Sequence, residues 1–352
     1  MREHIDLKPY NSFGLSVSAR YFTRVQTLEE LQEAVSFAKA NSLPMLLLGG
    51  GSNVLLRGDF PGLVIQMALM GITQTESTQD KVWVTAASGE HWHSFVEHCL
   101  AQGLHGLENL ALIPGCVGAA PMQNIGAYGV EVKDLITEVQ VLDIASGAIE
   151  RMSNAQCAFA YRDSVFKGPL RGKKIVLDVS FELSRSAAPN LSYGALADAL
   201  ADKEGVVTAQ DVFDTVCAIR REKLPDPRVL GNAGSFFKNP VLSAEDFAKL
   251  QQAHPALPSF AAPGTAGERK VPAAWLIEQA GWKGKQQGGA AVYEKQALVI
   301  VNRDHATAED VVSLAMAIIE SVHSRFGVAL EPEVQWIPAL ENPTNMVGWL
   351  AR

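Results

Sequence analysis

Residues 44–56 read PMLLLGGGSNVLL, and this stretch decides the class of fold. Its first part is an apolar run typical of a buried strand, and three glycines with a Ser-Asn pair follow directly. Val54–Leu56 then resumes the apolar pattern, which predicts a second strand where a dinucleotide-binding domain would start a helix. A helical pattern over 28–42 behind the N-cap candidate Thr27, and a short strand at Gly62–Ile65, complete a predicted βαββ-type unit.

The glycine turn of this unit has the properties of an anion site. Main-chain N–H groups in such a turn can form a nest for phosphate oxygens. The spacing matches neither G-x-G-x-x-G nor a phosphate loop ending in G-K-[ST], and alone it is a weak indication. Residues 115–129, GCVGAAPMQNIGAYG, form a second small-residue loop with almost no charge. The pair predicts two loops that clasp one pyrophosphate.

Composition excludes several classes of function. The chain has 352 residues, with 47% hydrophobic and 19% charged residues, which is ordinary for a soluble enzyme of two or three domains. It has no apolar run long enough to span a membrane, and its charged N-terminus lacks an apolar signal core. A net charge of −8 without a basic stripe argues against nucleic acid. We therefore expect a cytoplasmic protein that contacts neither membrane nor nucleic acid. A monomer is our working hypothesis for its oligomeric state, which the sequence does not reveal.

The cysteines and one histidine pair do not indicate a metal. Cys99, Cys116, Cys157 and Cys217 are scattered without C-x-x-C spacing, so we expect them to be reduced and mostly buried. His91-Trp92-His93 would place two imidazoles on one face of an extended segment. With no further ligand nearby, surface or packing roles are the simpler interpretation.

The remaining pattern gives elements and a boundary. Lys223-Leu224-Pro225-Asp226-Pro227 is a rigid connector that we interpret as a domain boundary. Periodicity predicts strands at 82–86, 138–144, 148–152, 174–183, 297–302 and 328–337, and helices at 91–102, 206–221, 243–253, 272–280 and 308–326. A Pro/Gly/Ala loop is expected at 255–267.

Three further motifs carry candidate side chains. GNAGSFFKNP, residues 231–240, would expose Ser235 while its two phenylalanines anchor the segment, although an ordinary loop is equally compatible. Arg162 lies in YRDS, where a structural ion pair is the simpler account. Glu331-Pro332-Glu333 carries two carboxylates, for which a solvated strand end is the alternative.

Taken in order, these motifs resemble the family of UDP-N-acetylenolpyruvoylglucosamine reductases, in its longer class with a tyrosine loop. The matching segments span nearly the whole chain; they are residues 11–14, 48–53, 107–115, 123–129, 161–164, 191–194, 223–227, 231–240 and 331–334. The resemblance implies an α+β protein with a FAD-binding fold of the vanillyl-alcohol-oxidase (PCMH) type in two subdomains. It also implies a C-terminal α+β substrate-binding domain.

The resemblance further implies domain limits and site residues. The subdomains would be 1–70 and 71–221, the latter completed by 328–352, and the substrate-binding domain 222–327. Arg162, Ser235 and Glu333 match the catalytic positions. Substrate contacts would come from Tyr193, Lys223, Asn239, Gly234 and Gln296. FAD contacts would come from Gly49, Gly50, Gly51, Ser52, Asn53, Ile113, Pro114, Gly115, Gly118, Ala119, Ala120, Gln123, Asn124, Ile125, Gly126, Ala127 and Gly129.

Two departures weaken side-chain contacts to the cofactor. Gly50 stands where some members carry Glu, and Ala119-Ala120 where some carry two serines. Main-chain amides can still bind a pyrophosphate.

The implied reaction is reduction of an enolpyruvyl ether with noncovalent FAD, and with NADPH as co-substrate. Hydride from reduced flavin N5 would reach the terminal carbon, and charge would then develop beside the carboxylate. Arg162 suits that charge, Glu333 would assist, and Ser235 would donate the proton. Two alternatives stay open: another FAD-dependent oxidase of the same fold, and a flavin-binding module without catalysis.

Overall fold

The computed structural model describes residues 1–262 and 267–337, and the chain divides into two compact units. The first unit comprises Met1–Ile5, Arg20–Gly50 and Pro61–Glu222, and the second comprises Asp6–Ala19, Gly51–Phe60 and the chain from Lys223 onward. The glycine turn at 49–53 is therefore shared between the units. The finer division into three domains stays a prediction.

A four-stranded sheet contains the predicted strand at the glycine turn. Its order is β1 (Arg2–Asp6), β2 (Ser18–Val25), β5 (Phe60–Met67) and β3 (Met45–Leu48), with β3 parallel to β5. The helix α1 (Leu28–Ala40) begins at Thr27, whose hydroxyl accepts the N–H of Glu30. The glycine turn lies between β3 and a second strand, β4 (Val54–Leu56). The predicted N-cap and the predicted strands on both sides of the turn are thus confirmed.

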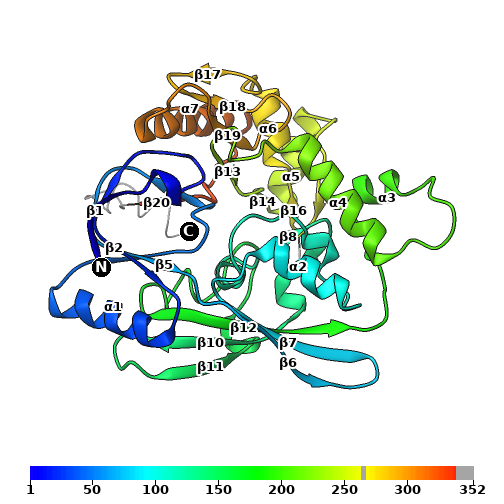
Figure 1. Ribbon diagram of the computed structural model, residues 1–352. Helices are drawn as coiled ribbons and strands as arrows, with labels where there is room; N and C mark the ends of the chain where they lie inside the picture. Colours follow the sequence, from blue (N-terminus) through cyan, green and yellow to red (C-terminus); the bar gives the residue numbers. More distant parts are fainter. Residues whose placement is uncertain (263–266, 338–352) are drawn as a thin grey trace. The chain divides into compact units, whose positions relative to one another are not determined.

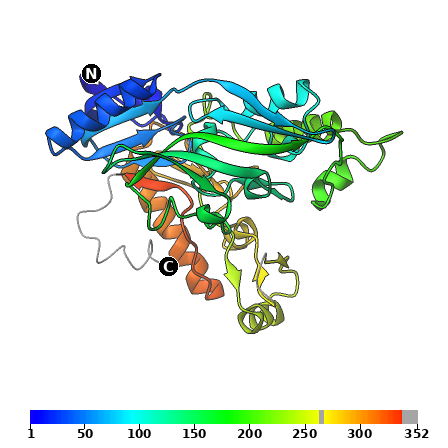
Figure 2. The same ribbon diagram turned by 90° about the horizontal axis from the view of Figure 1, so that it is seen from below.

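The first unit also contains a five-stranded antiparallel sheet. Its order is β11 (Ile149–Ser153), β10 (Ile136–Asp143), β12 (Lys174–Ser184), β7 (Lys81–Ala87) and β6 (Ile72–Ser77). Figure 1 shows α2 (Trp92–Ala101) beside this sheet, and Figure 2 shows the long strands running side by side. Buried Trp92, Phe95 and Phe181 join helix and sheet in one core. The short hairpin β8 (Gly126–Ala127) and β9 (Val130–Glu131), with α3 (Gly194–Ala199) and α4 (Ala209–Lys223), completes this unit.

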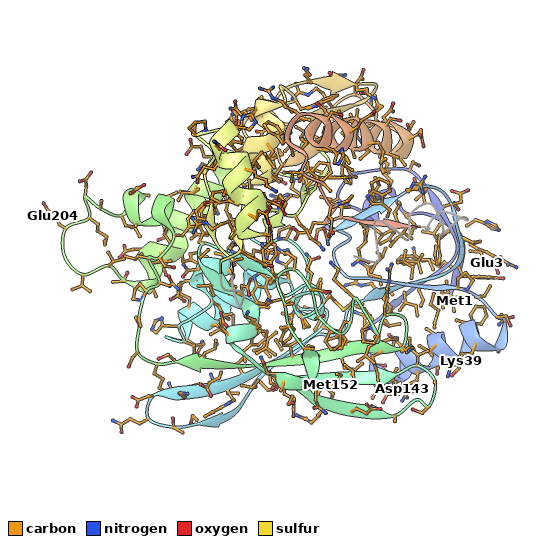
Figure 3. All side chains as sticks on the ribbon, turned by 180° about the vertical axis from the view of Figure 1, so that it is seen from behind. Met1, Glu3, Lys39, Asp143, Met152 and Glu204 are labelled. Carbon is orange, nitrogen blue, oxygen red and sulfur yellow. The ribbon has the colours of Figure 1, made fainter. Side chains whose placement is uncertain are left out.

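A separate core joins α1 to both sheets of the first unit. Leu31 and Val35 of α1 pack with Leu63 of β5 and Leu177 of β12. At the end of the helix, the Lys39 ammonium donates to the carbonyl oxygen of Ala145 at 2.9 Å. Figure 3 labels Lys39 at the end of this helix and Asp143, the last residue of β10. These contacts fix the helix over the sheets.

The described part of the second unit contains three α-helices and three small sheets, the last of which involves β4. One sheet has the order β13 (Asn232–Ser235), β19 (Val299–Asn302), β18 (Ala290–Val292) and β17 (Gln286–Gln287). Another has the order β14 (Val241–Leu242), β16 (Arg269–Lys270) and β15 (Phe260–Ala261). The helices are α5 (Ala244–Ala253), α6 (Ala273–Gln279) and α7 (Ala308–Phe326), and their apolar faces share one core with Phe13 and Phe236.

The chain after α7 differs from its prediction. Within residues 328–337, where a strand was predicted throughout, Gln335–Ile337 forms the strand β20, which pairs in parallel with β4, with Trp336 opposite Leu55. The sequence analysis expected this segment beside residues 71–221, but the described strand pairs with residues 54–56 of the second unit. The predicted loop at 255–267 holds the short strand β15, and its residues 263–266 lie outside the described residues, as do residues 338–352 of the expected C-terminal segment.

Gly51 is a position where only glycine fits. Its φ is +59°, and a Cβ there would lie 2.0 Å from the carbonyl oxygen of Tyr10. We expect Gly51→Ala to lower the free energy of unfolding by about 2–5 kcal/mol, because it combines backbone strain with overpacking. Urea unfolding measures this. Gly58→Ala is the matched control, because a Cβ at Gly58 meets nothing within 4 Å; equal stability of the two variants would contradict the argument.

Candidate functional site

Two glycine segments of the first unit lie backbone to backbone. A Cβ at Gly50 would lie 3.3 Å from Cα of Gly115, and one at Gly49 would lie 3.4 Å from Sγ of Cys116. The Gly50 N–H also donates to the Cys116 sulfur, although burial, the larger effect, raises the pKa of this thiol. The two predicted loops therefore meet in the first unit.

The second loop is fastened along its length by main-chain bonds. Val117 N–H donates to Glu90 O at 2.9 Å, and Gly118 N–H donates to Ser88 O at 3.0 Å. A Cβ at Gly118 would lie only 2.5 Å from Cβ of Ser88. The Ser88 hydroxyl is buried, and within the described residues it has no hydrogen-bond partner. This leaves one polar group beside the loop with unmet bonding capacity.

Farther along, the loop turns on left-handed residues. Tyr128 and Gly129 have φ of 47° and 84°, as a two-residue hairpin turn of type I′ requires. Asn124, at φ 44°, is fully buried, and its side chain bonds to Glu131, Ala160 and Lys133. These contacts give the Asn124 side chain a structural role. The predicted contact of Asn124 with the cofactor would therefore come from its main chain.

Arg162 is held by the same loop. Its Nη2 donates to Gly126 O at 2.6 Å and its Nη1 to Asn124 O at 3.3 Å. Its own φ is +54°, in the left-handed region. Such strain in a non-glycine residue persists only where the surroundings fix it, and it gathers at functional sites. The loop thus orients a permanent cation.

The predicted tyrosine loop rests on this turn. The Tyr193 side chain, 40% exposed, packs edge-to-face on Tyr128 at 5.3 Å between ring centres. The Arg220 guanidinium donates to the Tyr128 hydroxyl. The Asn109 amide donates to the carbonyl oxygens of Tyr128 and Asn190, both at 2.9 Å. The sequence pattern assigned no role to Tyr128, Arg220 or Asn109, although Asn109 and Tyr128 lie in the segments 107–115 and 123–129 that resemble the family.

In the second unit, Ser235 lies at the end of β13 and is exposed, whereas Phe236 and Phe237 are buried. Gly234, at φ +69°, precedes it, and the Gly234 N–H donates to the buried Asn232 side chain at 2.9 Å. This confirms the expected arrangement of an exposed hydroxyl between a turn and aromatic anchors.

The second unit brings Glu333 close to this segment. Glu333 N–H donates to Phe236 O at 2.8 Å, and Lys238 N–H donates to Glu331 O at 2.9 Å. The Glu331 carboxylate pairs with the Lys238 ammonium at 3.1 Å. The Asn53 amide donates to Glu333 O at 3.4 Å, which ties the glycine turn to the same place. Ser235 and Glu333 are therefore neighbours across a short two-segment pairing.

The other predicted substrate residues are also in the second unit. Lys223 is the exposed last residue of α4. The Asn239 side chain accepts the N–H of Ala273 at 2.9 Å and so helps to cap α6. The Gln296 side chain accepts the N–H of Leu298 at 3.3 Å. Arg162 and Tyr193 belong to the first unit, so the joining of the two sets stays a prediction.

The histidine motif begins the helix predicted at 91–102, so the interpretation of residues 91–93 as one extended segment is wrong. His91 is the N-cap of α2, and Trp92 and His93 form its first turn. In residues 1–262 and 267–337, no group of three or more His, Cys, Asp or Glu is arranged to hold a metal. Cys99, Cys157 and Cys217 are buried and Cys116 partly so, which confirms the expectation for the thiols. Among the described helices, none combines the length and apolar character needed to cross a bilayer.

Comparison with known families defines the class of protein. Residues 19–153 match the FAD binding domain family, and residues 226–337 match the family described as UDP-N-acetylenolpyruvoylglucosamine reductase, C-terminal domain. The chain is thus an FAD-dependent oxidoreductase with a PCMH-type cofactor domain.

Full-length relatives are more specific. UDP-N-acetylenolpyruvoylglucosamine reductase of Neisseria meningitidis serogroup A is 49% identical, covering 96% of this chain and 98% of its own. The enzyme of Pasteurella multocida is 49% identical, and the match covers 94% of this chain and 96% of that enzyme. The enzyme of Pseudomonas putida is 47% identical, with 94% of this chain and 97% of that enzyme covered. The crystal structure of the reductase (MurB) from Thermus caldophilus aligns with a TM-score of 0.64 at 26% identity, covering 96% and 98%. The chain belongs to the UDP-N-acetylenolpyruvoylglucosamine reductase family.

Proposed function

We propose that Arg162, Ser235 and Glu333 are the catalytic residues of this family's reaction and that each has a different role in it. The reaction reduces the enolpyruvyl group of UDP-N-acetylglucosamine enolpyruvate to UDP-N-acetylmuramate, a peptidoglycan precursor, with FAD as cofactor and NADPH as reductant. The observation that carries the proposal is the bond from Glu333 N–H to Phe236 O, which brings the Glu333 backbone to within one residue of the exposed Ser235.

The residues at the glycine loops fit FAD. A pyrophosphate needs close approach to main-chain N–H groups, and a Cβ at Gly50 would lie 3.3 Å from Cα of Gly115, so the two backbones approach closely there. Ser88 adds a buried hydroxyl with unmet bonding capacity beside Gly118. We therefore assign residues 49–53 and 113–129 to cofactor binding. The bound flavin supplies the hydride of the reaction.

Arg162 has the properties needed to stabilise the developing charge. After hydride addition, negative charge spreads from the substrate carbon into its carboxylate, and a fixed cation stabilises that state more than the ground state. Two main-chain carbonyls orient the guanidinium, so little reorganisation is needed during the reaction. Ser235 then donates its proton to the same carbon, and Glu333 interacts with the carboxylate end of the substrate.

We assign the diphosphate of the sugar nucleotide to Tyr193, Lys223 and Asn239, with Gly234 and Gln296 lining the sugar side. An exposed lysine and a partly exposed tyrosine can approach an anion from solvent. A cytoplasmic location and a monomeric state belong to the same proposal. Light scattering of the purified protein tests the second of these.

The absorbance spectrum of the purified protein tests the function. We expect a flavin spectrum that NADPH bleaches and that the enolpyruvyl sugar nucleotide restores, because each half-reaction changes the oxidation state of the flavin. Acid should release the flavin into the supernatant, since it is held without a covalent bond. Bleaching with rapid recovery by oxygen alone would favour an oxidase, and a flavin that NADPH does not bleach would favour a binding module.

A further inference from the structure

The motif at residues 91–93 contacts the predicted cofactor loop at several points. The Trp92 N–H donates to Gly115 O at 3.0 Å, and the Trp92 indole donates to Leu110 O at 2.8 Å. The main chain of His91 forms an isolated antiparallel β-bridge with that of Cys116. The first turn of α2 therefore holds the main chain on both sides of residues 112–114.

His93 supplies a contact in the middle of this segment. Its Nδ1 accepts the N–H of Leu112 at 3.2 Å. Leu112 has a φ of 56°, a conformation that costs a non-glycine residue free energy and needs support from its surroundings. Leu112 directly precedes Ile113-Pro114-Gly115, so its backbone angles set the direction of the chain through those residues.

The ring of His93 is fixed in the orientation that this bond needs. It stacks on Phe213 of α4 with 5.4 Å between ring centres and 8° between planes. Its Nε2 lies 3.5 Å from Oε1 of Glu97, one helical turn along α2. A proton on Nε2 faces a carboxylate and leaves Nδ1 as the acceptor, so the neutral ring has a defined tautomer.

We propose that His93 is a positioning residue for the cofactor loop, whose neutral Nδ1 holds Leu112 in the left-handed conformation that presents residues 113–115 to FAD. The proposal rests on the assignment of those residues to the cofactor. It makes cofactor affinity dependent on the protonation of a side chain that need not touch the cofactor.

The charged groups around His93 favour its neutral form. Burial is the largest influence and lowers the pKa of His93; Glu97 opposes it, while His91 before α2 and Arg221 and Arg220 on α4 lower it further. Consider the pH range between the ordinary histidine pKa of about 6.5 and the lowered pKa of His93. In this range, a His93 side chain that has lost the bond to Leu112 binds more protons than one that keeps the bond. The contribution of the contact is therefore complete above pH 6.5 or so and is lost as the pH falls through the lowered pKa. Protonated Nδ1 would turn an N–H toward the Leu112 N–H.

Two substitutions separate the acceptor from the ring. In His93→Asn, the amide oxygen stands near the place of Nδ1 and cannot titrate. In His93→Phe, the ring stacking on Phe213 is kept but the acceptor is lost, which leaves the Leu112 N–H without a partner. Flavin fluorescence on dilution of the holoenzyme gives the FAD dissociation constant of each variant. We expect His93→Phe to weaken FAD by about 5- to 100-fold at pH 8, and His93→Asn to stay within a few-fold of wild type.

The pH profile gives a readout that a packing role would not move. As the pH falls from about 8 to about 5, wild-type affinity for FAD should fall more steeply than that of His93→Asn. His98→Asn, an exposed histidine on the same helix, is the matched control and should follow wild type. Circular dichroism verifies that each variant is folded. The proposal fails if folded His93→Phe binds FAD like wild type, or if His93→Asn titrates like wild type. A wild-type chain that binds no FAD would instead refute the proposed function and this inference with it.

Discussion

Ser235→Ala should keep near-normal reduction of the flavin by NADPH and lose its reoxidation by the enolpyruvyl substrate about 10²–10⁴-fold. The first half-reaction needs no proton donor at a substrate carbon, whereas the second does. Ser235 is exposed at the end of β13 with buried Phe236 beside it, so removal of its hydroxyl leaves the packing intact. Stopped-flow absorbance of the flavin follows each half separately.

Two further variants test whether slow reoxidation in Ser235→Ala comes from the loss of a proton donor. Ser235→Cys should recover part of the reoxidation rate, because a thiol can still donate a proton. Ser313→Ala, at a helix position of the same unit, should match wild type in both halves, since its hydroxyl bonds to Glu309 on the same helix. If Ser235→Ala reoxidises with the substrate as fast as wild type, Ser235 is not the donor.

Arg162→Lys should slow reoxidation by the substrate about 10²–10³-fold, although the charge is conserved. The guanidinium uses separate nitrogens for Gly126 O and Asn124 O, and a single ammonium cannot reproduce that geometry. The backbone strain at φ +54° is the same for lysine, so the comparison isolates the head group. The rate of flavin reoxidation, at saturating substrate, is the measurement.

Arg171→Lys provides the matched control in the same unit, because Arg171 is exposed. It should behave like wild type in both half-reactions. Equal rates for Arg162→Lys and wild type would show that any cation at this position suffices and would remove the oriented guanidinium from the mechanism. A variant that has also lost FAD would show in its absorbance before the reaction begins.

Local sequence patterns were sufficient for most elements and for the motifs. α1 begins at its expected cap, and the strands on both sides of the glycine turn lie where the apolar runs predicted them. The exposed serine between a glycine and two buried phenylalanines also follows from residue type alone. At residues 91–93 two sequence interpretations overlapped: the three-residue alternation suggested an extended segment, whereas the longer pattern over 91–102 predicted the helix that is found.

The sequence by itself determined the order of the motifs and, through their resemblance to the family, the candidate site residues within them. Only the tertiary structure decided how they are held. The contacts of Arg162 with Gly126, of His93 with Leu112 and of Glu333 with Phe236 each join residues far apart in the chain. Such contacts form when long-range packing fixes two backbones at hydrogen-bond distance, and local periodicity has no information about that distance.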